Sequence, residues 1–253
     1  MAHIIAITNQ KGGVGKTTTA GSLGVALGML KKKVLCVDLD PQGSLGFNLG
    51  VDIEDCITIY EVLKGTATVQ QSVQKLKYCD IIPSNILLSS AELEFNRPGR
   101  EFLLRAALAP LEKLYDYIII DTPPALNILT INAYTVANSL LIPMIPDILS
   151  LLGISQIKET IDTVKEYYNK DLHLFGILLT KYNSRTRLAR EVKEMSEQIA
   201  KTLGTKVLST FIRNSVCVAE APAHGETVMT YAPKSGPADD YRTLAKKIAT
   251  GKL

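Results

Sequence analysis

Short runs of β-branched and other apolar residues alternate along the chain with longer stretches of helical spacing. The strand-like runs cover 4–8, 34–38, 79–83, 117–121, 139–143, 174–180 and 206–211. Between them, 17–30 and 151–168 have helical apolar spacing, and a third helix is indicated by steps of four, three and four between Leu188, Val192, Met195 and Ile199. This alternation is typical of a parallel sheet built from βαβ units.

The strand-like runs also indicate how the sheet is covered. Tyr117 to Ile120 are apolar in succession rather than alternating with polar residues, which is the pattern of a strand buried on both faces. We therefore predict an α/β fold with a doubly wound, mostly parallel sheet and helices on both faces, in one domain spanning 1–253. The stretch 85–108 is less regular, with a turn at 97–100, and indicates no function.

The amino-acid composition excludes only a few classes of protein. The net charge is +3, from 28 Lys and Arg against 25 Asp and Glu, so any basic patch must be local. The four cysteines stand far apart without a CxxC pair, which argues against a disulfide framework or a zinc site and fits a reducing cytoplasm. No signal peptide precedes the first strand and no apolar run approaches the roughly 20 residues of a membrane span, so we expect a soluble protein.

A glycine-rich loop follows the first strand and leads directly into a helix. It reads Lys11-Gly12-Gly13-Val14-Gly15-Lys16-Thr17-Thr18. Glycines let successive backbone N–H groups converge on phosphate oxygens, and the helix N-terminus adds partial positive charge. In such a loop Lys16 contacts the β- and γ-phosphates, and the Thr17 hydroxyl is a ligand of Mg²⁺. The order strand, loop, helix therefore predicts an ATP or GTP site.

Three carboxylates stand at or just beyond the ends of two predicted strands. Asp38 and Asp40 come at the end of 34–38, and Asp121 ends the strand that precedes Thr122-Pro123-Pro124. The carboxyl ends of parallel strands share one edge of the sheet, so all three should lie near the phosphate loop. We predict that Asp121 holds Mg²⁺ together with Thr17. Asp38 and Asp40 could instead cap the N-terminus of a helix.

One departure from the common phosphate-loop pattern is informative, because Gln10 stands where the strict pattern has glycine and Lys11 follows it. The loop resembles that of the ParA/MinD/nitrogenase-iron-protein group, which reads KGGxGK[ST]. The resemblance implies that Lys11 reaches across an ATP-sandwiched homodimer to the partner's phosphates. It also implies that Asp40 orients or activates the attacking water and that Asp38 supports it. The alternative for Lys11 is a solvated loop lysine.

Later segments resemble Soj-type ParA proteins over nearly the whole chain. They include Lys181 to Thr186, Ile212-Arg213-Asn214, 219–225 and 231–235, although Phe211 and Ala232 replace the usual proline and aspartate. The resemblance places Arg213 and Asn214 near the adenine, and no guanine signature is present, so ATP is favoured over GTP. It also implies an ATP-dependent dimerisation switch that works with a ParB-like centromere-binding protein in plasmid or chromosome partition.

The same resemblance implies non-specific binding of duplex DNA by a nucleoid-associated protein. The chain begins at the first strand, so we expect no separate domain for reading an operator sequence. Arginines able to contact phosphates are Arg185, Arg187, Arg190 and Arg213. The helix that carries Arg190 also holds Glu191 and Glu194, so it could be a mixed solvated face instead, and Arg213 could serve adenine or DNA.

Two other members of the group offer alternative functions. A MinD-like positioning ATPase would anchor to membrane through a basic amphipathic C-terminal helix, but 244–253 is short and lacks aromatic residues. A reductase like the nitrogenase iron protein needs cluster thiolates, and no cysteine lies near Asp121. The sequence favours the partition ATPase over both.

Overall fold

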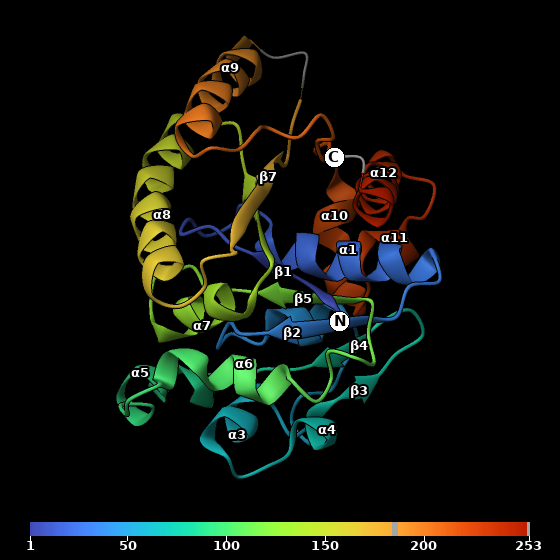
Figure 1. The fold of residues 1–253 in the computed structure, drawn as a ribbon. Helices are drawn as coiled ribbons and strands as arrows, with labels where there is room; N and C mark the ends of the chain where they lie inside the picture. The colour runs from blue at the N-terminus through green and yellow to red at the C-terminus, as the bar shows by residue number, and fades with distance from the viewer. Residues whose placement is uncertain (184–186, 252–253) are drawn as a thin grey trace.

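The computed structural model describes residues 1–183 and 187–251, and its centre is a seven-stranded sheet (Figure 1). The strand order is β3-β4-β2-β5-β1-β6-β7. All neighbours are parallel except β3 and β4. The strands are β1 (His3–Ile7), β2 (Val34–Asp38), β3 (Gln74–Lys75), β4 (Asp80–Ile82), β5 (Tyr117–Asp121), β6 (Ser139–Met144) and β7 (His173–Leu179). The predicted mostly parallel α/β sheet is confirmed.

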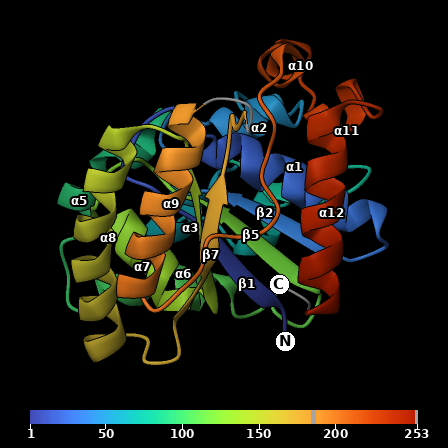
Figure 2. The same ribbon diagram turned by 90° about the horizontal axis from the view of Figure 1, so that it is seen from above.

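Helices cover both faces of this sheet, as Figures 1 and 2 show from two directions. On one face lie α1 (Lys16–Met29), α11 (Val228–Tyr231) and α12 (Gly236–Thr250), with α2 (Ser44–Asn48), α10 (Val216–Glu220) and η3 (Ala221–His224) near the site end. On the other side lie α3 (Ile59–Lys64), α4 (Val69–Ser72), η1 (Ile86–Ser90), α5 (Ala91–Glu94), η2 (Arg100–Phe102), α6 (Leu103–Leu108), α7 (Ile128–Val136), α8 (Ile148–Tyr167) and α9 (Arg187–Thr202). The sheet is therefore doubly wound, as predicted.

Alternating side chains of the strands feed two separate hydrophobic cores. On β1, Ile4 and Ala6 belong to the core under α3, α6 and α7, whereas Ile5 and Ile7 belong to the core under α1 and α12. Each of these four side chains is at most 3% exposed. Burial on both faces explains why the strands are apolar without alternation, and it holds the strand ends rigidly for the site.

One predicted strand is wrong, and one strand was missed. The stretch 206–211 runs beside β7 but forms only an isolated bridge between Ile177 and Val207. Gly176 has a φ of 153° where the register between β6 and β7 shifts, and this irregularity interrupts the outer edge of β7. The missed strand β3 has two residues, too few for a periodic signal.

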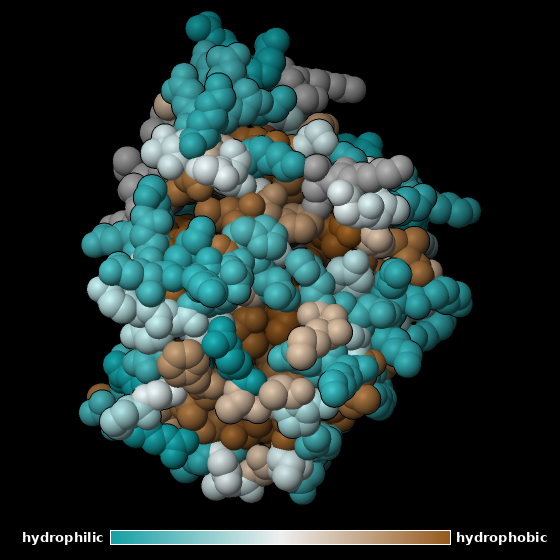
Figure 3. Space-filling model, in the orientation of Figure 1, coloured by the Kyte–Doolittle hydropathy of each residue, from teal (hydrophilic) through white to brown (hydrophobic). Residues whose placement is uncertain are grey.

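The helix predicted from the apolar spacing around Val192 and Met195 is confirmed as α9, but these two side chains are not equally buried. Val192 is fully buried, but Met195 is 41% exposed. The buried position beside Val192 is taken by Ser196, whose hydroxyl donates to the Val192 carbonyl oxygen at 2.6 Å. A serine whose hydroxyl donates to a carbonyl oxygen of its own helix can face the core. A pattern that counts only apolar residues therefore does not find this buried position. Hydrophilic side chains cover the exposed side of α9 (Figure 3).

The edge of the sheet that positions the site is formed by the carboxyl ends of β1, β2 and β5. Ile7 on β1 and Asp38 on β2 both stand in register with Asp121 on β5. The loop after β1 leads into α1, and the loop after β2 leads into α2. The sheet order therefore brings the phosphate loop and the carboxylates together, although they are far apart in the sequence.

Candidate nucleotide site

The glycine loop has the backbone conformation that a phosphate cradle requires. Gly13 and Gly15 have φ values of 72° and 89°, in the region that favours glycine. A Cβ added at Gly12 or Gly13 would meet no described atom within 4 Å, so open space lies beside the loop. Gly15 begins α1 without a side-chain cap, which leaves the first N–H groups of this helix directed at the open space.

Residues at the ends of neighbouring strands hold this loop in place. The Thr180 hydroxyl donates to the Val14 carbonyl oxygen at 2.7 Å. Asn9 donates from its side-chain amide to the Pro143 carbonyl oxygen at 2.7 Å, and its Oδ1 accepts from the Lys11 N–H at 2.9 Å. Sequence reasoning missed Asn9 and Thr180. Thr180 directly follows β7 and Asn9 lies two residues beyond β1, so the strand-end rule that found Asp38 and Asp121 could have found them.

Lys16 is a buried cation at the base of the loop. It is 7% exposed, and its Nζ donates to the Lys11 carbonyl oxygen at 3.2 Å. Burial lowers the pKa of Lys16, while Asp121 and Asp40 act in the opposite direction. A buried ammonium group with a single long hydrogen bond can bind a further anionic oxygen.

Lys11 is held within its own chain. Its Nζ lies 2.6 Å from Oδ2 of Asp147, which stands between β6 and α8, and both side chains are about one-third exposed, at 32% each. The alternative of a solvated loop lysine therefore describes Lys11 only in part, because its ammonium group is held by a carboxylate. Sequence reasoning missed Asp147, which lies three residues beyond the end of β6.

Asp121 is the most unusual group at this edge. It is fully buried, and within the described chain neither of its carboxylate oxygens has a hydrogen-bond partner. Burial raises the pKa of Asp121 well above its ordinary value, and the nearby Asp38 raises it further, while Thr17 and Lys16 oppose the rise. A buried carboxylate without a partner beside a threonine hydroxyl fits a bound divalent cation.

The oxygen atoms available near Asp121 suit Mg²⁺, which needs few protein ligands, better than a metal ion that is bound by protein side chains alone. The described residues contain no cluster of three or more His, Cys, Asp or Glu side chains that could hold a metal. Asp121 and Thr17 supply oxygen atoms only, and Mg²⁺ commonly completes its shell with water and phosphate oxygens. The predicted Thr17 and Asp121 pair is compatible with this geometry.

Asp38 and Asp40 have different surroundings. Asp38 is fully buried and accepts from the N–H groups of Asp40 and Leu45, both at 2.9 Å, so it holds the loop and the start of α2. Burial raises the pKa of Asp38 to about 7. Asp40 is only half-buried, faces the cleft, and accepts from the Gln42 N–H at 3.1 Å. The helix-capping alternative therefore describes Asp38 in part, and Asp40 is the acid open to a ligand.

A cleft of about 860 Å³ extends from the phosphate loop. Gly12, Gly13, Gly15, Lys16, Thr17, Thr18 and Asp40 line one end, and Lys181, Ile212 to Val216, Val218, Ala219 and Pro222 line the other. Arg213 and Asn214 thus lie in the same cleft as the loop. Its volume is within the range of small-molecule sites.

The Arg213 guanidinium is not free within the cleft wall. It forms two hydrogen bonds to the Asp240 carboxylate, of 2.9 Å from Nε and 2.8 Å from Nη2, and Nη2 also donates to the Gly236 carbonyl oxygen at 2.9 Å. A Cβ at Gly236 would lie 2.8 Å from the guanidinium carbon, so this glycine allows the close packing. The arrangement favours a structural role for the charge over a DNA contact.

Two other predicted DNA-binding arginines, Arg187 and Arg190, do not line the cleft. Arg187 and Arg190 are exposed at the start of α9, and Arg187 pairs with Glu191 at 2.7 Å. Arg185 lies outside the described residues. The expectation of a mixed charged face on α9 agrees with the pairs of Arg187 with Glu191 and Lys193 with Glu197.

The C-terminal helix is packed against the fold. Tyr241, Leu244 and Ile248 on α12 are buried in the core under α1, and the Tyr241 hydroxyl hydrogen-bonds to Thr19 at 3.2 Å. The apolar face of α12 is therefore already covered. Among the described helices, none combines the length and the apolar character that crossing a membrane requires.

Comparisons with known proteins agree with this geometry. A family model described as an AAA domain matches residues 2–174. The sporulation initiation inhibitor protein Soj of Bacillus subtilis is 42% identical, covering 98% of this chain and 99% of Soj. The chromosome partitioning protein ParA of Myxococcus xanthus is 40% identical, covering 98% of this chain and 88% of its own.

Solved structures share the fold along the full length. A Mycobacterium smegmatis structure called cobyrinic acid a,c-diamide synthase, with a bound ATP analogue and magnesium, is 36% identical with a TM-score of 0.86, covering 98% of this chain and 95% of its own. The Cyanothece McdA–ATP complex is 25% identical with a TM-score of 0.87, covering 100% and 97%. Together with the deviant phosphate loop, these matches show that the chain belongs to the Soj/ParA family of P-loop partition proteins.

Proposed function

We propose that this protein binds Mg²⁺ and ATP in the cleft, hydrolyses ATP, and uses the cycle as a dimerisation switch in DNA partition. The observation that carries the proposal is the buried Asp121 carboxylate, which has no hydrogen-bond partner in the described chain. It lies near Lys16, at the end of the cleft where the glycine loop leads into the uncapped N-terminus of α1. Leaving such groups unsatisfied costs free energy unless a ligand compensates. An Mg²⁺–triphosphate supplies both the cation and the anion that these groups lack.

Each residue of the loop has one task in this proposal. The backbone N–H groups from Gly12 to Thr18 bind phosphate oxygens, and Lys16 contacts the β- and γ-phosphates. Thr17 and Asp121 hold Mg²⁺, which neutralises charge on the phosphates when bound. The apolar end of the cleft, with Val216, Val218 and Pro222, suits a purine, and we assign the side chain of Asn214 to its polar edge.

Hydrolysis is assigned to Asp40 with support from Asp38. Asp40 lines the cleft with one oxygen bound to a backbone N–H, so it can also accept a hydrogen bond from water. Asp38 fixes the Asp40 backbone through its own carboxylate. The division of labour predicted by the family resemblance is thus compatible with the burial of the two acids.

The dimerisation switch is assigned to Lys11. In the single chain it is bound to Asp147, so it must exchange this carboxylate for the partner's phosphate if it acts in trans. An exchange of one anion for another at a partly exposed site costs little. The equilibrium between the two pairings then depends on whether a second chain with ATP is present.

Non-specific DNA binding and a ParB-like partner complete the proposal. Its support is membership of a family whose relatives are named for chromosome partitioning, together with the exposed Arg187 and Arg190 on α9. Two copies of this surface in a dimer would double the phosphate contacts, so DNA affinity should require ATP and fall steeply with salt.

The test is Lys11→Ala, with Lys165→Ala as control because Lys165 is exposed on α8, outside the cleft lining. We expect the variant to bind ATP with Mg²⁺ almost as tightly as the parent. It should remain monomeric by sedimentation and lose more than about 90% of ATP hydrolysis, since a trans cation of this kind contributes several orders of magnitude in other P-loop proteins.

DNA binding in the presence of ATP should be lost together with the dimer, and the control should behave as the parent. A Lys11→Ala protein that dimerises and hydrolyses ATP normally would refute the trans role. If the parent itself shows neither ATP binding nor hydrolysis, the whole proposed function fails.

A further inference from the structure

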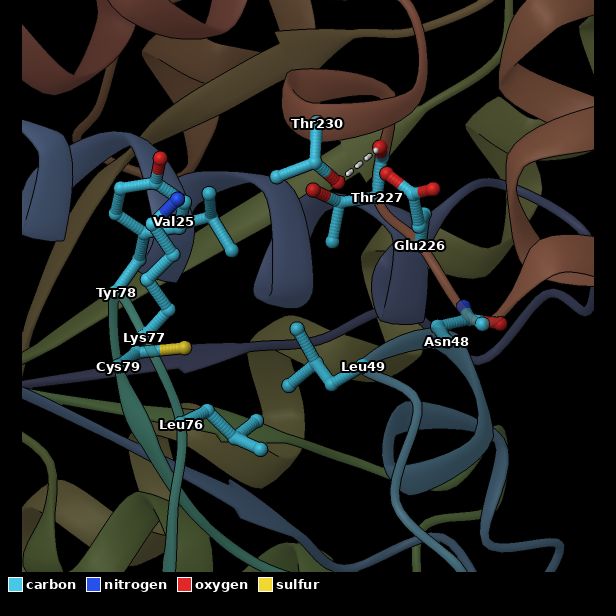
Figure 4. A pocket seen from close by; sticks show the side chains of 11 residues that line it. Val25, Asn48, Leu49, Leu76, Lys77, Tyr78, Cys79, Glu226, Thr227 and Thr230 are labelled. Carbon is cyan, nitrogen blue, oxygen red and sulfur yellow. Dashed lines mark hydrogen bonds between the residues drawn. The ribbon is translucent and has the colours of Figure 1, made fainter.

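A hollow of about 290 Å³ lies on the α1 side of the sheet, next to the nucleotide cleft (Figure 4). Segments far apart in the sequence form it: α1, the end of α2, the connection between β3 and β4, and the turn that leads into α11. Among the described residues, only Asn48 lines both this hollow and the nucleotide cleft. The hollow is therefore a separate site, and its volume is near the lower limit of small-molecule sites.

Part of the wall of this hollow is apolar. Figure 4 shows Val25 of α1 above Leu49 and Leu76, with the hollow between them. Val25 is 4% exposed, whereas Leu49 and Leu76 are only half-buried. Covering the exposed part of these two leucines with an apolar group is favourable, so the hollow suits a ligand with an aliphatic part.

Two charged side chains of opposite sign, Lys77 and Glu226, stand on opposite sides of the hollow (Figure 4). In the described part of the chain, neither has an oppositely charged group within ion-pair distance. Lys77 is exposed, with its ammonium nitrogen 5.1 Å from the centre of the Tyr78 ring, and Glu226 is half-buried. A ligand of one charge would be attracted on one side and repelled on the other, so this pair selects a zwitterion.

Thr227 adds a buried hydroxyl to the lining of the hollow. The residue is 7% exposed, and within the described chain its Oγ1 has no hydrogen-bond partner. Thr227 stands at the N-terminus of α11, yet its side chain does not cap that helix. A Cβ added at Gly21 of α1 would lie 3.3 Å from the Thr227 methyl carbon, so the methyl group faces α1. A ligand that supplies a hydrogen bond would compensate the buried hydroxyl.

We propose that this hollow binds a free α-amino acid with an aliphatic side chain. Lys77 pairs with the carboxylate and Glu226 with the ammonium group, while the side chain covers Leu49 and Leu76. The Thr227 hydroxyl forms a hydrogen bond to one of the two charged groups. The inference goes beyond the proposed ATP cycle, because no residue of the phosphate loop, which the structure describes in full, lines the hollow.

The experiment titrates nucleotide-free protein with L-leucine by isothermal titration calorimetry. We expect a dissociation constant of about 0.1–1 mM, which is the range for a ligand of this small size. Two analogues of leucine each lack one charge: 4-methylpentanoate has no ammonium group, and 3-methylbutylamine has no carboxylate. Each analogue should bind at least about 10-fold more weakly, because one ion pair is lost and its protein partner stays unpaired.

Variants test whether the named side chains make these contacts. Lys77→Met and Glu226→Gln should each weaken leucine binding at least about 10-fold, and Thr227→Val at least about threefold. Lys77→Met should not weaken binding of 3-methylbutylamine, since this analogue has no carboxylate. The matched controls are Lys165→Met and Glu166→Gln, at exposed positions of α8, which should bind leucine as the parent does. Thermal unfolding checks that each variant is folded.

Several results would overturn the inference: no leucine binding, hollow variants that bind leucine as the controls do, or a single-charge analogue that binds as tightly as leucine. Leucine should also bind in saturating Mg²⁺–ATP. Displacement by ATP would place leucine in the nucleotide cleft and contradict the inference. A protein that binds leucine but not ATP would refute the proposed function alone, so the two failures are distinguishable.

Discussion

The two ends of the central sheet differ in whether their polar groups have hydrogen-bond partners within the chain. At the amino-terminal end, the Asn138 side chain accepts from the Ile4 N–H at 2.7 Å, and the Ser139 hydroxyl is shared with His3 at 2.9 Å and His173 at 3.1 Å. At the carboxyl end, Asp121 has no hydrogen-bond partner in the described chain and Lys16 has one long hydrogen bond. The first arrangement stabilises the fold by itself, whereas the second is complete only with a ligand.

This difference separates residues that stabilise from residues that bind. The cores on both faces of the sheet are equally tight at the two ends, because Ile5, Ile7, Ile118 and Ile120 are all fully buried. Packing therefore does not distinguish the ends. The buried charges of Asp121 and Lys16 do, and substitutions at the two ends should have different consequences.

The largest effect is expected for Lys16→Ala at the carboxyl end. Removal of the buried ammonium group takes away the charge that faces the β- and γ-phosphates, so ATP affinity should fall by at least about 100-fold, or roughly 3 kcal/mol. Thermal stability without nucleotide should change little, because the lost group has few partners. Isothermal titration with Mg²⁺–ATP measures the first effect. Unchanged affinity would remove the nucleotide site from this cleft.

A smaller effect on binding, with a large effect on turnover, is expected for Asp40→Ala. Hydrolysis should slow by about 100-fold or more because the group that positions water is lost. Binding of Mg²⁺–ATP should be within about threefold of the parent, and the ATP-bound dimer should accumulate. A steady-state phosphate assay with sedimentation in ATP tests both. Persistent turnover would assign the water to another group.

The smallest effect is expected at the amino-terminal end, for His3→Gln. Burial and the neighbouring His173 lower the pKa of His3 below 6.5, so the unfolded chain binds more protons between the folded pKa and pH 6.5. The contribution of neutral His3 is present above pH 6.5 and is lost as pH falls through this window. Urea unfolding at pH 7 and pH 5 should show a decline in the parent that exceeds the decline in the variant by less than about 1 kcal/mol. An equal decline would contradict this assignment.

Much of the fold and part of the site could be predicted from sequence. Buried strands such as β5 carry an unbroken apolar signal, and the loop from Lys11 to Thr18 has a spacing set by phosphate geometry. The stretch 206–211 has the same local signal as a strand, but pairing depends on the neighbouring edge at Gly176, which no local pattern reports.

Other features of the site depend on distant contacts. The pair of Lys11 with Asp147 joins residues 136 positions apart, and the anchoring of Arg213 by Asp240 requires the placement of α12. Side-chain charge is visible in a sequence, but the partner that neutralises it is not. This is why Arg213 could be predicted both for adenine and for DNA, whereas its ion pair with Asp240 favours a structural role for its charge over a DNA contact.

The central claim is that the carboxyl end of the sheet is incomplete without Mg²⁺–ATP, and Asp121→Asn tests it most directly by thermal unfolding at pH 8 with and without Mg²⁺–ATP. Without ligand, the variant should melt about 2–4 °C higher than the parent, because a buried charge without a partner is replaced by a neutral group, a gain of roughly 1 kcal/mol. The gain should shrink toward pH 5, since the raised pKa of Asp121 leaves the carboxyl increasingly protonated in the folded parent. With Mg²⁺–ATP, the parent should be stabilised strongly and the variant only weakly. A variant that melts lower than the parent without ligand, yet is stabilised equally by Mg²⁺–ATP, would show that Asp121 is a structural group and would contradict the account.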